Sequence, residues 1–318
     1  MLTVFDGEVR PLEEGGQPHH SVHEWQQEDI DAINAALAAR RPLLLSGDPG
    51  VGKTQLAKAA AIELGFAYVH QVVDTNTEAR ELRWTQDLVQ RLSDAQLAGG
   101  QGSGSGGARE PIDYVEPGPL WWAFSWGTAR KQVAKRNQCE IQDAPTPPQP
   151  DTKRCDPANG MVLLIDEIDK AEPELPNSLL EALGAREFQV PWRNAAVKAD
   201  VWPLVIVTTN NDRPLPDAFV RRCLFHEMAL PELSKLEDFL FERGKLQSTG
   251  APETLLKHIA QMVVKDRSFA IENELRPYPG QAEFFDLLRA ATELEADENM
   301  LRRIAPFFLK KHPADRYS

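Results

Sequence analysis

The chain has 318 residues, of which 42% are apolar and 26% are charged, and its formal net charge at pH 7 is −13. This composition is that of a globular protein and excludes wholesale disorder, collagen and long coiled coils. The length allows two domains, and a protein this acidic repels the phosphate backbone of nucleic acids. We therefore expect protein partners and no direct contact with nucleic acid.

No apolar run in the sequence approaches the roughly 20 residues that a membrane-spanning helix needs. The acidic segment 1–16 also lacks the apolar core of a secretory signal. The three cysteines, Cys139, Cys155 and Cys223, are too few and too odd in number for a disulfide framework. We expect free thiols, no membrane association and a cytoplasmic location.

The first third of the sequence predicts an arm followed by a βαβ unit. Residues 1–28 show little periodicity and are predicted to be an N-terminal arm. The elements expected after the arm are a helix over 29–39, a strand over 43–45, a glycine-rich turn over 47–52, a helix over 53–64 and a strand over 66–73. A strand, loop, helix and strand in this order are typical of a parallel sheet.

Two irregular inserts interrupt the middle of the chain. Glycine and serine dominate 98–108, which predicts a flexible insert, and 137–158 is predicted to be a proline-rich insert. Between them the pattern predicts one helix over 119–135. Its aromatic residues fit either a packed helix face or an aromatic pore loop that grips a substrate: Trp121, Trp122, Phe124 and Trp126.

The remaining pattern separates an α/β part from an all-α part. The elements expected first are a strand over 161–165, a helix over 173–183, a hairpin within 187–201 and a strand over 204–209. After residue 230 only helices are expected, over 231–244, 252–265, 279–292 and 296–309. We predict a parallel-sheet α/β domain over 29–230 and a small all-α domain over 231–318.

The segment 47–54 reads GDPGVGKT and fits the pattern G-x-x-x-x-G-K-[ST] of a phosphate-binding loop. Its glycines allow the backbone to wrap around a phosphate and to point N–H groups at it. Lys53 is expected to reach the β- and γ-phosphates, and the Thr54 hydroxyl to bind Mg²⁺. Because the loop stands between a predicted strand and a predicted helix, we expect a nucleoside triphosphate site.

Polar residues follow the two later buried strands. Asp166 and Glu167 end one of them, at the strand edge where ligands bind in open α/β sheets. Asp166 is expected to hold Mg²⁺, and Glu167 to polarise an attacking water. Asn210 either orients that water or is a plain turn former. Arg221 and Arg222 are either a surface pair or the source of a guanidinium for a transferring phosphoryl group.

These elements, in this order, resemble the AAA+ ATPases. The stretches LLIDEIDKAEPELPNSLLEAL (163–183) and LPDAFVRRC (215–223) are similar to the MoxR branch, which has an insert in helix 2 and a hairpin before sensor 1. The resemblance covers roughly residues 30–230. It implies a P-loop core, an all-α lid and hydrolysis of ATP, with GTP as the alternative nucleotide.

The resemblance also implies a role for each matching residue. The Walker A segment that would bind the nucleotide consists of Gly47, Asp48, Pro49, Gly50, Val51, Gly52, Lys53 and Thr54, followed by Gln55. Asp166 and Glu167 would be Walker B, and Asn210 would be sensor 1. Arg222, with Arg221 as the second choice, would be the arginine finger that acts on the neighbouring subunit.

Further segments match the family with one departure. Residues 83–117 would form the helix-2 insert, and 187–201 the hairpin before sensor 1. The family places an arginine, sensor 2, at the start of a lid helix. Gln281 aligns with that position in this chain, and Arg276 is the nearest substitute.

The resemblance implies a homo-oligomeric ring, a hexamer, that hydrolyses ATP between subunits to remodel or activate a protein client. A partner with a von Willebrand A-like domain is one such client. Two other functions fit the same motifs. A slow nucleotide-dependent switch or scaffold is favoured by the missing sensor 2 arginine and disfavoured by Glu167. A nuclease-associated NTPase motor is disfavoured by the acidic charge.

Overall fold

The computed structural model describes residues 1, 8–12, 21–100, 109–247 and 250–311. The described chain forms two compact units, the first mainly from residues 23–46 and 54–226 and the second mainly from 47–53 and 227–311. Much of the predicted glycine-rich insert, residues 101–108, and part of the predicted N-terminal arm lie outside the described residues.

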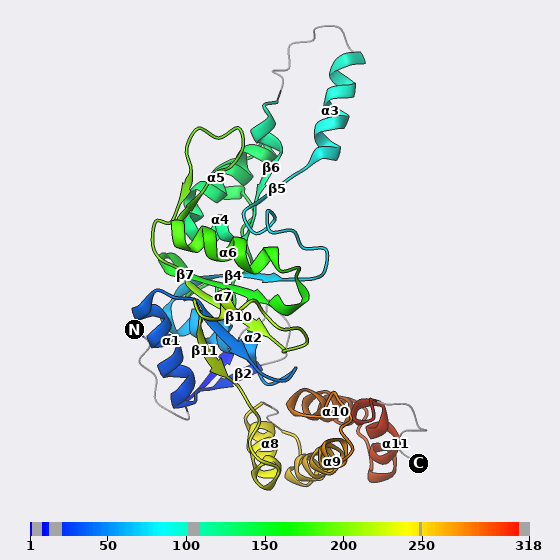
Figure 1. Cartoon of the computed structure of the whole chain (residues 1–318). Helices are drawn as coiled ribbons and strands as arrows, with labels where there is room; N and C mark the ends of the chain where they lie inside the picture. Colours follow the sequence, from blue (N-terminus) through cyan, green and yellow to red (C-terminus); the bar gives the residue numbers. More distant parts are fainter. Residues whose placement is uncertain (2–7, 13–20, 101–108, 248–249, 312–318) are drawn as a thin grey trace. The chain divides into compact units, whose positions relative to one another are not determined.

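A five-stranded sheet forms the centre of the first unit, in the order β11-β3-β10-β7-β4 (Figure 1). Its strands are β3 (Leu43–Ser46), β4 (Phe66–Val72), β7 (Asp156–Asp166), β10 (Leu204–Thr209) and β11 (Leu224–Glu227). β10 runs parallel to both β3 and β7, and β7 runs parallel to β4. Thr209 pairs with Ser46 and Val72 pairs with Asp166, so the carboxyl ends of these strands lie at one edge of the sheet.

The strands are apolar because helices cover the sheet. All residues of β3 and β10 are buried, as expected for strands inside a parallel sheet. Helices of the first unit include α1 (Gln27–Ala39), α2 (Lys53–Leu64), α4 (Pro119–Phe124), α5 (Trp126–Asn137) and α6 (Glu174–Ala185). The predicted α/β class, with helices alone after the sheet, is confirmed.

The single helix predicted over 119–135 is wrong, because the chain forms α4 and α5 with a break at Ser125. Ser125 leaves the helical conformation (φ −150°, ψ 83°), and its hydroxyl donates to Asp200 Oδ2 at 2.7 Å. The side chains of Trp121, Trp122 and Phe124 are buried in the core of the first unit. Of the two interpretations of these aromatic residues, the structure supports core packing.

Short elements surround the sheet. Residues predicted as an arm contain β1 (Val9–Leu12) and β2 (Ser21–Glu24), which pair with each other. Trp25 directly after them is completely buried, so this part of the predicted arm is packed structure. The region of the predicted helix-2 insert contains β5 (Trp84–Gln86), α3 (Leu88–Gly100) and β6 (Val115–Pro117), with β5 antiparallel to β6.

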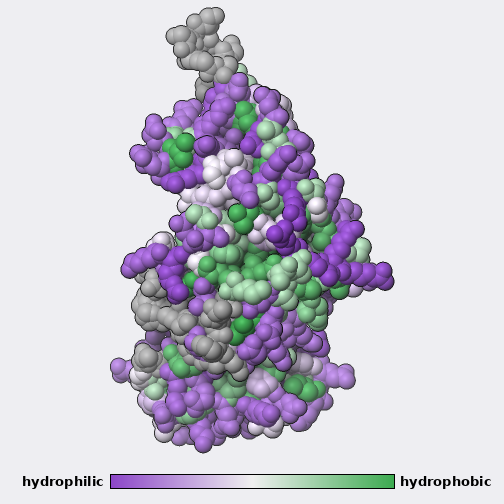
Figure 2. Space-filling model, turned by 90° about the vertical axis from the view of Figure 1, so that its left-hand side faces the viewer, coloured by the Kyte–Doolittle hydropathy of each residue, from purple (hydrophilic) through white to green (hydrophobic). Residues whose placement is uncertain are grey.

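The predicted hairpin within 187–201 consists of β8 (Glu187–Phe188) and β9 (Val197–Lys198), which pair antiparallel. A single helical turn, α7 (Asp217–Val220), follows β10 and leads to β11. Short 3₁₀ helices occur at Pro111–Tyr114, Ile141–Asp143 and Ile168–Lys170. Hydrophilic residues cover most of the face in Figure 2, and hydrophobic residues appear in several places, most of them around the middle of the view.

The second unit has its own apolar core between four helices. These are α8 (Leu233–Gln247), α9 (Glu253–Glu272), α10 (Gln281–Glu293) and α11 (Glu298–Leu309). Leu240, Ile259 and Phe284 are completely buried in this core. Gly244 allows close packing, because a Cβ there would lie 2.8 Å from Leu256 and 2.9 Å from Phe284. None of the helices in the described ranges is long and apolar enough to cross a membrane.

Candidate functional site

The end of β7 brings together side chains from four elements of the first unit. Asp166 Oδ2 accepts a hydrogen bond from the Thr54 hydroxyl at 2.9 Å and lies 3.3 Å from His70 Nε2. Thr208, in β10, donates its hydroxyl to Asp166 Oδ1. The same hydroxyl accepts from the backbone N–H of Glu167 at 2.9 Å. Thr54, at the start of α2, thus lies beside Asp166 although 112 positions separate them in sequence.

These contacts decide the charge of Asp166. Burial raises the pKa of Asp166, but hydrogen bonds from His70, Thr208 and Thr54 more than offset this effect, so its pKa lies below the usual value. The group is therefore a carboxylate at neutral pH. A hydroxyl and a carboxylate oxygen side by side are hard ligands of the kind that Mg²⁺ takes in phosphate-binding sites, so Thr54 and Asp166 fit this ion.

Glu167 directs its carboxylate to different partners. Its backbone is left-handed (φ 61°, ψ 45°), a conformation uncommon for residues other than glycine and frequent at functional sites. Lys170 Nζ donates to Glu167 Oε2 at 2.5 Å, and Asn210 Nδ2 donates to Oε1 at 3.4 Å. The ion pair with Glu167 raises the pKa of Lys170. Glu167 and Asn210, both expected to act on water, are hydrogen-bonded to each other.

Asp169 holds the loop after β10 in place. Its side chain is buried, and its Oδ2 accepts from the backbone N–H groups of Asn210, at 3.3 Å, and Asp212, at 2.9 Å. The sequence alone does not indicate Asp169, Thr208, His70 and Lys170 as site residues. Most of their partners are distant in sequence, and the one signal was the charged segment DEIDK (166–170).

The glycine-rich loop 47–52 belongs to the second unit and fits a phosphate in its backbone conformation. Gly47, Gly50 and Gly52 have φ values of 152°, 80° and 103°. A Cβ would lie 2.1 Å from Met228 O at Gly47 and 2.7 Å from Ala282 Cβ at Gly50, so larger residues do not fit. Lys53 Nζ donates to the carbonyls of Gly47, at 2.7 Å, and Asp48, at 3.1 Å.

The second unit also contains an arginine beside the glycine-rich loop that the sequence motifs do not indicate. Arg267, in α9, donates to Pro279 O at 2.8 Å, and its Nη2 lies 3.4 Å from Asp48 Oδ2. Gln281, the first residue of α10, is buried. Arg276 lies over the ring of Tyr278. Of the two arginines, Arg267 is the one that contacts the glycine-rich loop, and it lies in α9, away from the aligned position 281.

Arg221 and Arg222 follow α7, and both are exposed. In the described part of the chain, their side chains form no hydrogen bond with another predicted site residue. Their backbone carbonyls are bound by Arg41. This placement is compatible with both interpretations of the pair, a surface position and an action on another subunit.

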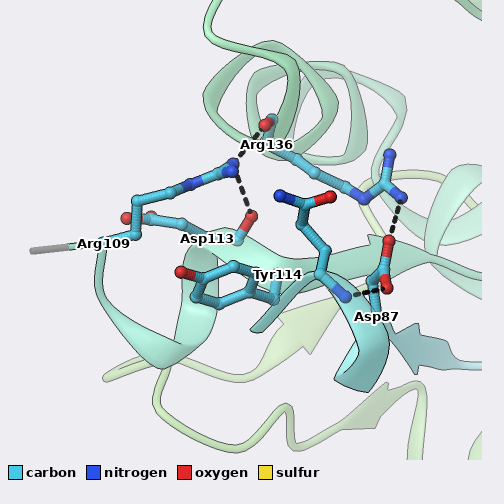
Figure 3. Close-up of a pocket in the computed structure, with 6 residues that line it drawn as sticks. Asp87, Arg109, Asp113, Tyr114 and Arg136 are labelled. Atoms are coloured by element: carbon cyan, nitrogen blue, oxygen red, sulfur yellow. Dashed lines mark hydrogen bonds and ion pairs between the residues drawn. The ribbon is translucent and has the colours of Figure 1, made fainter. Parts of the chain in front are cut away.

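A small polar pocket of about 160 Å³ lies elsewhere in the first unit and contains none of the predicted site residues (Figure 3). Arg136 Nη2 lies 3.3 Å from Asp87 Oδ2, and the Arg109 guanidinium lies 4.9 Å from the centre of the Tyr114 ring. The other charged groups have partners outside the pocket: Lys135 Nζ lies 2.7 Å from Asp113 Oδ1, and Asp94 Oδ2 lies 3.6 Å from Arg109 Nη1. Because these charged groups are already paired, we assign the pocket no part in the nucleotide chemistry.

A parallel sheet with a glycine-rich loop after one strand, and with a carboxylate pair after another, defines a P-loop nucleotide-binding domain. The family described as AAA domain (dynein-related subfamily) matches residues 42–223. This is more than half of the chain, and the chain belongs to this family. Membership implies nucleotide binding and an ATP-dependent function.

Solved structures of two bacterial proteins align with most of the chain. A presumed ATPase of Cytophaga hutchinsonii is 18% identical, with 88% of this chain and 84% of that protein covered and a TM-score of 0.38. The P216G mutant of Thermotoga maritima RuvB is 14% identical, with 90% of this chain and 69% of that protein covered and a TM-score of 0.45. No curated protein matches the chain.

Proposed function

We propose that this protein is an ATP hydrolase of the MoxR branch of AAA+ proteins, which assembles into a ring and remodels or activates a protein client. The observation that carries the proposal is the cluster at the end of β7. There Asp166 accepts a hydrogen bond from Thr54, and Glu167 accepts one from Asn210. One pair has the chemistry to hold a metal ion, and the other has the chemistry to direct a water molecule.

The proposed roles follow from the chemistry of each group. The backbone N–H groups of residues 47–52 and the Lys53 ammonium hold the phosphates of ATP, and Gln55 belongs to the same binding segment. Thr54 and Asp166 hold Mg²⁺, which supplies charge neutralisation at the phosphates when bound. Glu167 polarises the water, and Asn210 orients the Glu167 carboxylate. Arg222, with Arg221 as the second choice, acts on the site of the neighbouring subunit.

The wider organisation is proposed on the resemblance to the MoxR branch. Residues 29–230 form the nucleotide domain and 231–318 the lid of each subunit, in a hexamer. The helix-2 insert (83–117) and the hairpin within 187–201 pass the movement to the client. A cytoplasmic protein with a von Willebrand A-like domain is the client class that we propose, and GTP is the alternative substrate.

A second function is favoured by one contact. Lys170 lies 2.5 Å from Glu167 Oε2 and competes with water for this carboxylate. A protein whose Glu167 stays paired in this way hydrolyses ATP slowly and acts as a nucleotide-dependent switch or scaffold. Gln281 at the aligned sensor 2 position fits the same function, because an amide supplies no positive charge.

The decisive experiment measures steady-state hydrolysis of ATP, and of GTP in parallel, per subunit across a range of protein concentrations. We expect the rate to rise steeply with concentration and then to level off, because the site is completed by a neighbour. Glu167→Gln is expected to retain nucleotide binding and to lose hydrolysis by roughly 10²–10⁴-fold.

The matched control is Glu172→Gln, which makes the same change at an exposed residue nearby. This variant is expected to hydrolyse ATP at the wild-type rate. Tight nucleotide binding without hydrolysis at every concentration would favour the switch. A constant rate from a monomer would contradict the role of Arg222 in another subunit.

A further inference from the structure

A single arginine of the first unit holds the backbone from which Arg221 and Arg222 project. Arg41 lies between the end of α1 and the start of β3. Its Nε donates to Arg222 O at 3.0 Å, and its Nη2 donates to Arg221 O at 2.5 Å and to Cys223 O at 3.1 Å. One guanidinium therefore binds three consecutive carbonyls that lie about 180 positions away in sequence.

The chemistry of this contact is specific to arginine. A guanidinium presents its N–H donors in a rigid planar fork, whereas a lysine ammonium is a single point on a flexible stem. The three carbonyls belong to residues 221–223, the segment that connects α7 to β11. Arg41 satisfies all three groups at once.

The backbone on both sides of this contact is fixed as well. The N–H of Leu224 donates to Pro42 O at 2.8 Å, where β11 joins the sheet beside β3. Cys223 is buried, while Arg221 and Arg222 are exposed. The two arginines therefore extend from a backbone that is held on the sheet, which is the arrangement that a group needs to act at a fixed point outside its own subunit.

We propose that Arg41 is a positioning residue for the arginine that completes the nucleotide site of the neighbouring subunit. This inference rests on the proposed function, in which Arg222 or Arg221 acts in trans. It assigns Arg41 no contact with nucleotide. It predicts that loss of Arg41 damages the site of the neighbour and leaves the site of its own subunit intact.

The test is a mixing experiment with Arg41→Gln and Glu167→Gln. Each variant alone is expected to hydrolyse ATP slowly, and Arg41→Gln is expected to bind nucleotide like wild type. When the two are mixed, an Arg41→Gln subunit retains Glu167, and a Glu167→Gln neighbour offers it a well-placed arginine. Random assembly of equal amounts makes about one interface in four complete, so about a quarter of the wild-type rate should return.

Three controls make the result specific. Arg222→Ala, and Arg221→Ala, mixed with Glu167→Gln measure whether an arginine acts in trans at all. Arg40→Gln removes the same charge from the neighbouring exposed residue and is expected to keep the wild-type rate. Arg41→Lys keeps the charge without the fork and is expected to fall between wild type and Arg41→Gln. If Arg41→Gln folds poorly, Arg41→Lys replaces it in the mixing experiment.

The outcomes separate the two proposals. No gain from Arg41→Gln with Glu167→Gln, where the Arg222 or Arg221 variant does regain activity, would overturn the role of Arg41. No gain in any mixture would overturn the action of Arg221 and Arg222 in trans, and with it the inference on Arg41. A full rate in Arg41→Lys would show that charge suffices and would overturn the argument from the fork.

Discussion

Thr208 connects the two acidic residues of the candidate site through one hydroxyl group. The hydroxyl donates to Asp166 Oδ1 and accepts from the Glu167 N–H, and the side chain is completely buried. Valine has nearly the same shape but neither donates nor accepts. Thr208→Val would leave both partners without this bond inside the protein.

We expect Thr208→Val to lower the free energy of unfolding by about 1–3 kcal/mol, the cost of leaving buried polar groups unsatisfied. The measurement is chemical denaturation of both proteins. Thr292→Val is the control, since Thr292 is exposed and donates only to Leu288 O within its helix. Its effect should stay below about 0.5 kcal/mol, and an equally small effect at Thr208 would contradict the prediction.

The three cysteines of the described chain are free thiols, and they differ in burial and therefore in reactivity. Burial raises the pKa of the Cys223 thiol to about 12, while Arg41 acts weakly in the opposite direction. Burial also raises the pKa of Cys155. At pH 8 the thiolate of Cys223 is then on the order of one molecule in 10⁴, and only the thiolate reacts.

We therefore expect iodoacetamide at pH 8 to modify the partly exposed Cys139 first and Cys223 only after unfolding. Peptide mass mapping after timed labelling measures the order. If Cys223 in the native protein were modified as fast as Cys139, the thiol of Cys223 would not be buried as described.

At the scale of residues, the sequence predicts groups that a motif carries along the chain. Gly47–Thr54, Asp166 and Glu167 are recognisable because spacing within a few positions determines their chemistry. His70 and Thr208 are not, because they meet Asp166 only when separate strands pair. Arg267 is missed for a related reason: its contact with Asp48 depends on helix packing within the second unit.

At the scale of elements, α4 packs its aromatic side chains into the core of the first unit. Trp121 contacts Phe188 edge to face and lies beneath the Arg193 guanidinium, and its Nε1 donates to Thr128 Oγ1 at 2.9 Å. Trp192, between β8 and β9, is about half exposed and lies beside Trp84 and Arg91. The two tryptophans differ in burial and in backbone, since Trp192 has a φ of 62° while Trp121 lies in a helix.

We expect Trp121→Ala to lower the free energy of unfolding by about 3–5 kcal/mol, because it leaves a cavity in the core. Trp192→Ala should cost about 1 kcal/mol or less, since water already reaches its ring. Urea denaturation followed by circular dichroism compares the two. Equal losses would mean that α4 contributes no more to the core than the hairpin does.

Long helices could be predicted from their spacing, whereas several of the short strands could not. The helix over 53–64 has the predicted bounds, because a glycine-rich turn precedes it and Gly65 follows it. Strands such as β5 and β6 have three residues each, too few for alternation to be visible. The break at Ser125 depends on Asp200, 75 positions away, so local spacing continued the helix across it.

At the scale of the whole molecule, the α/β class could be predicted because apolar strands alternate with helices before residue 230 and helices alone follow. The order of the strands could not. The connections between strands determine which strands become neighbours in the sheet. The sequence shows only the order of the strands along the chain. β3 and β4, predicted as one βαβ unit, are separated in the sheet by β10 and β7.

This strand order has a consequence for the chain as it leaves the ribosome. β3 and β4 are made early, yet their sheet neighbours, β7 and β10, are completed only at Asp166 and Thr209. At about 5–20 residues per second, the interval between the end of β3 and the end of β10 lasts roughly 8–33 seconds. During that time the backbone edge of β3 lacks its neighbour β10, and β4 lacks β7 until Asp166 is made. Unpaired edges are the state in which strands aggregate. The strand order thus exposes the nascent chain to aggregation before the sheet can close.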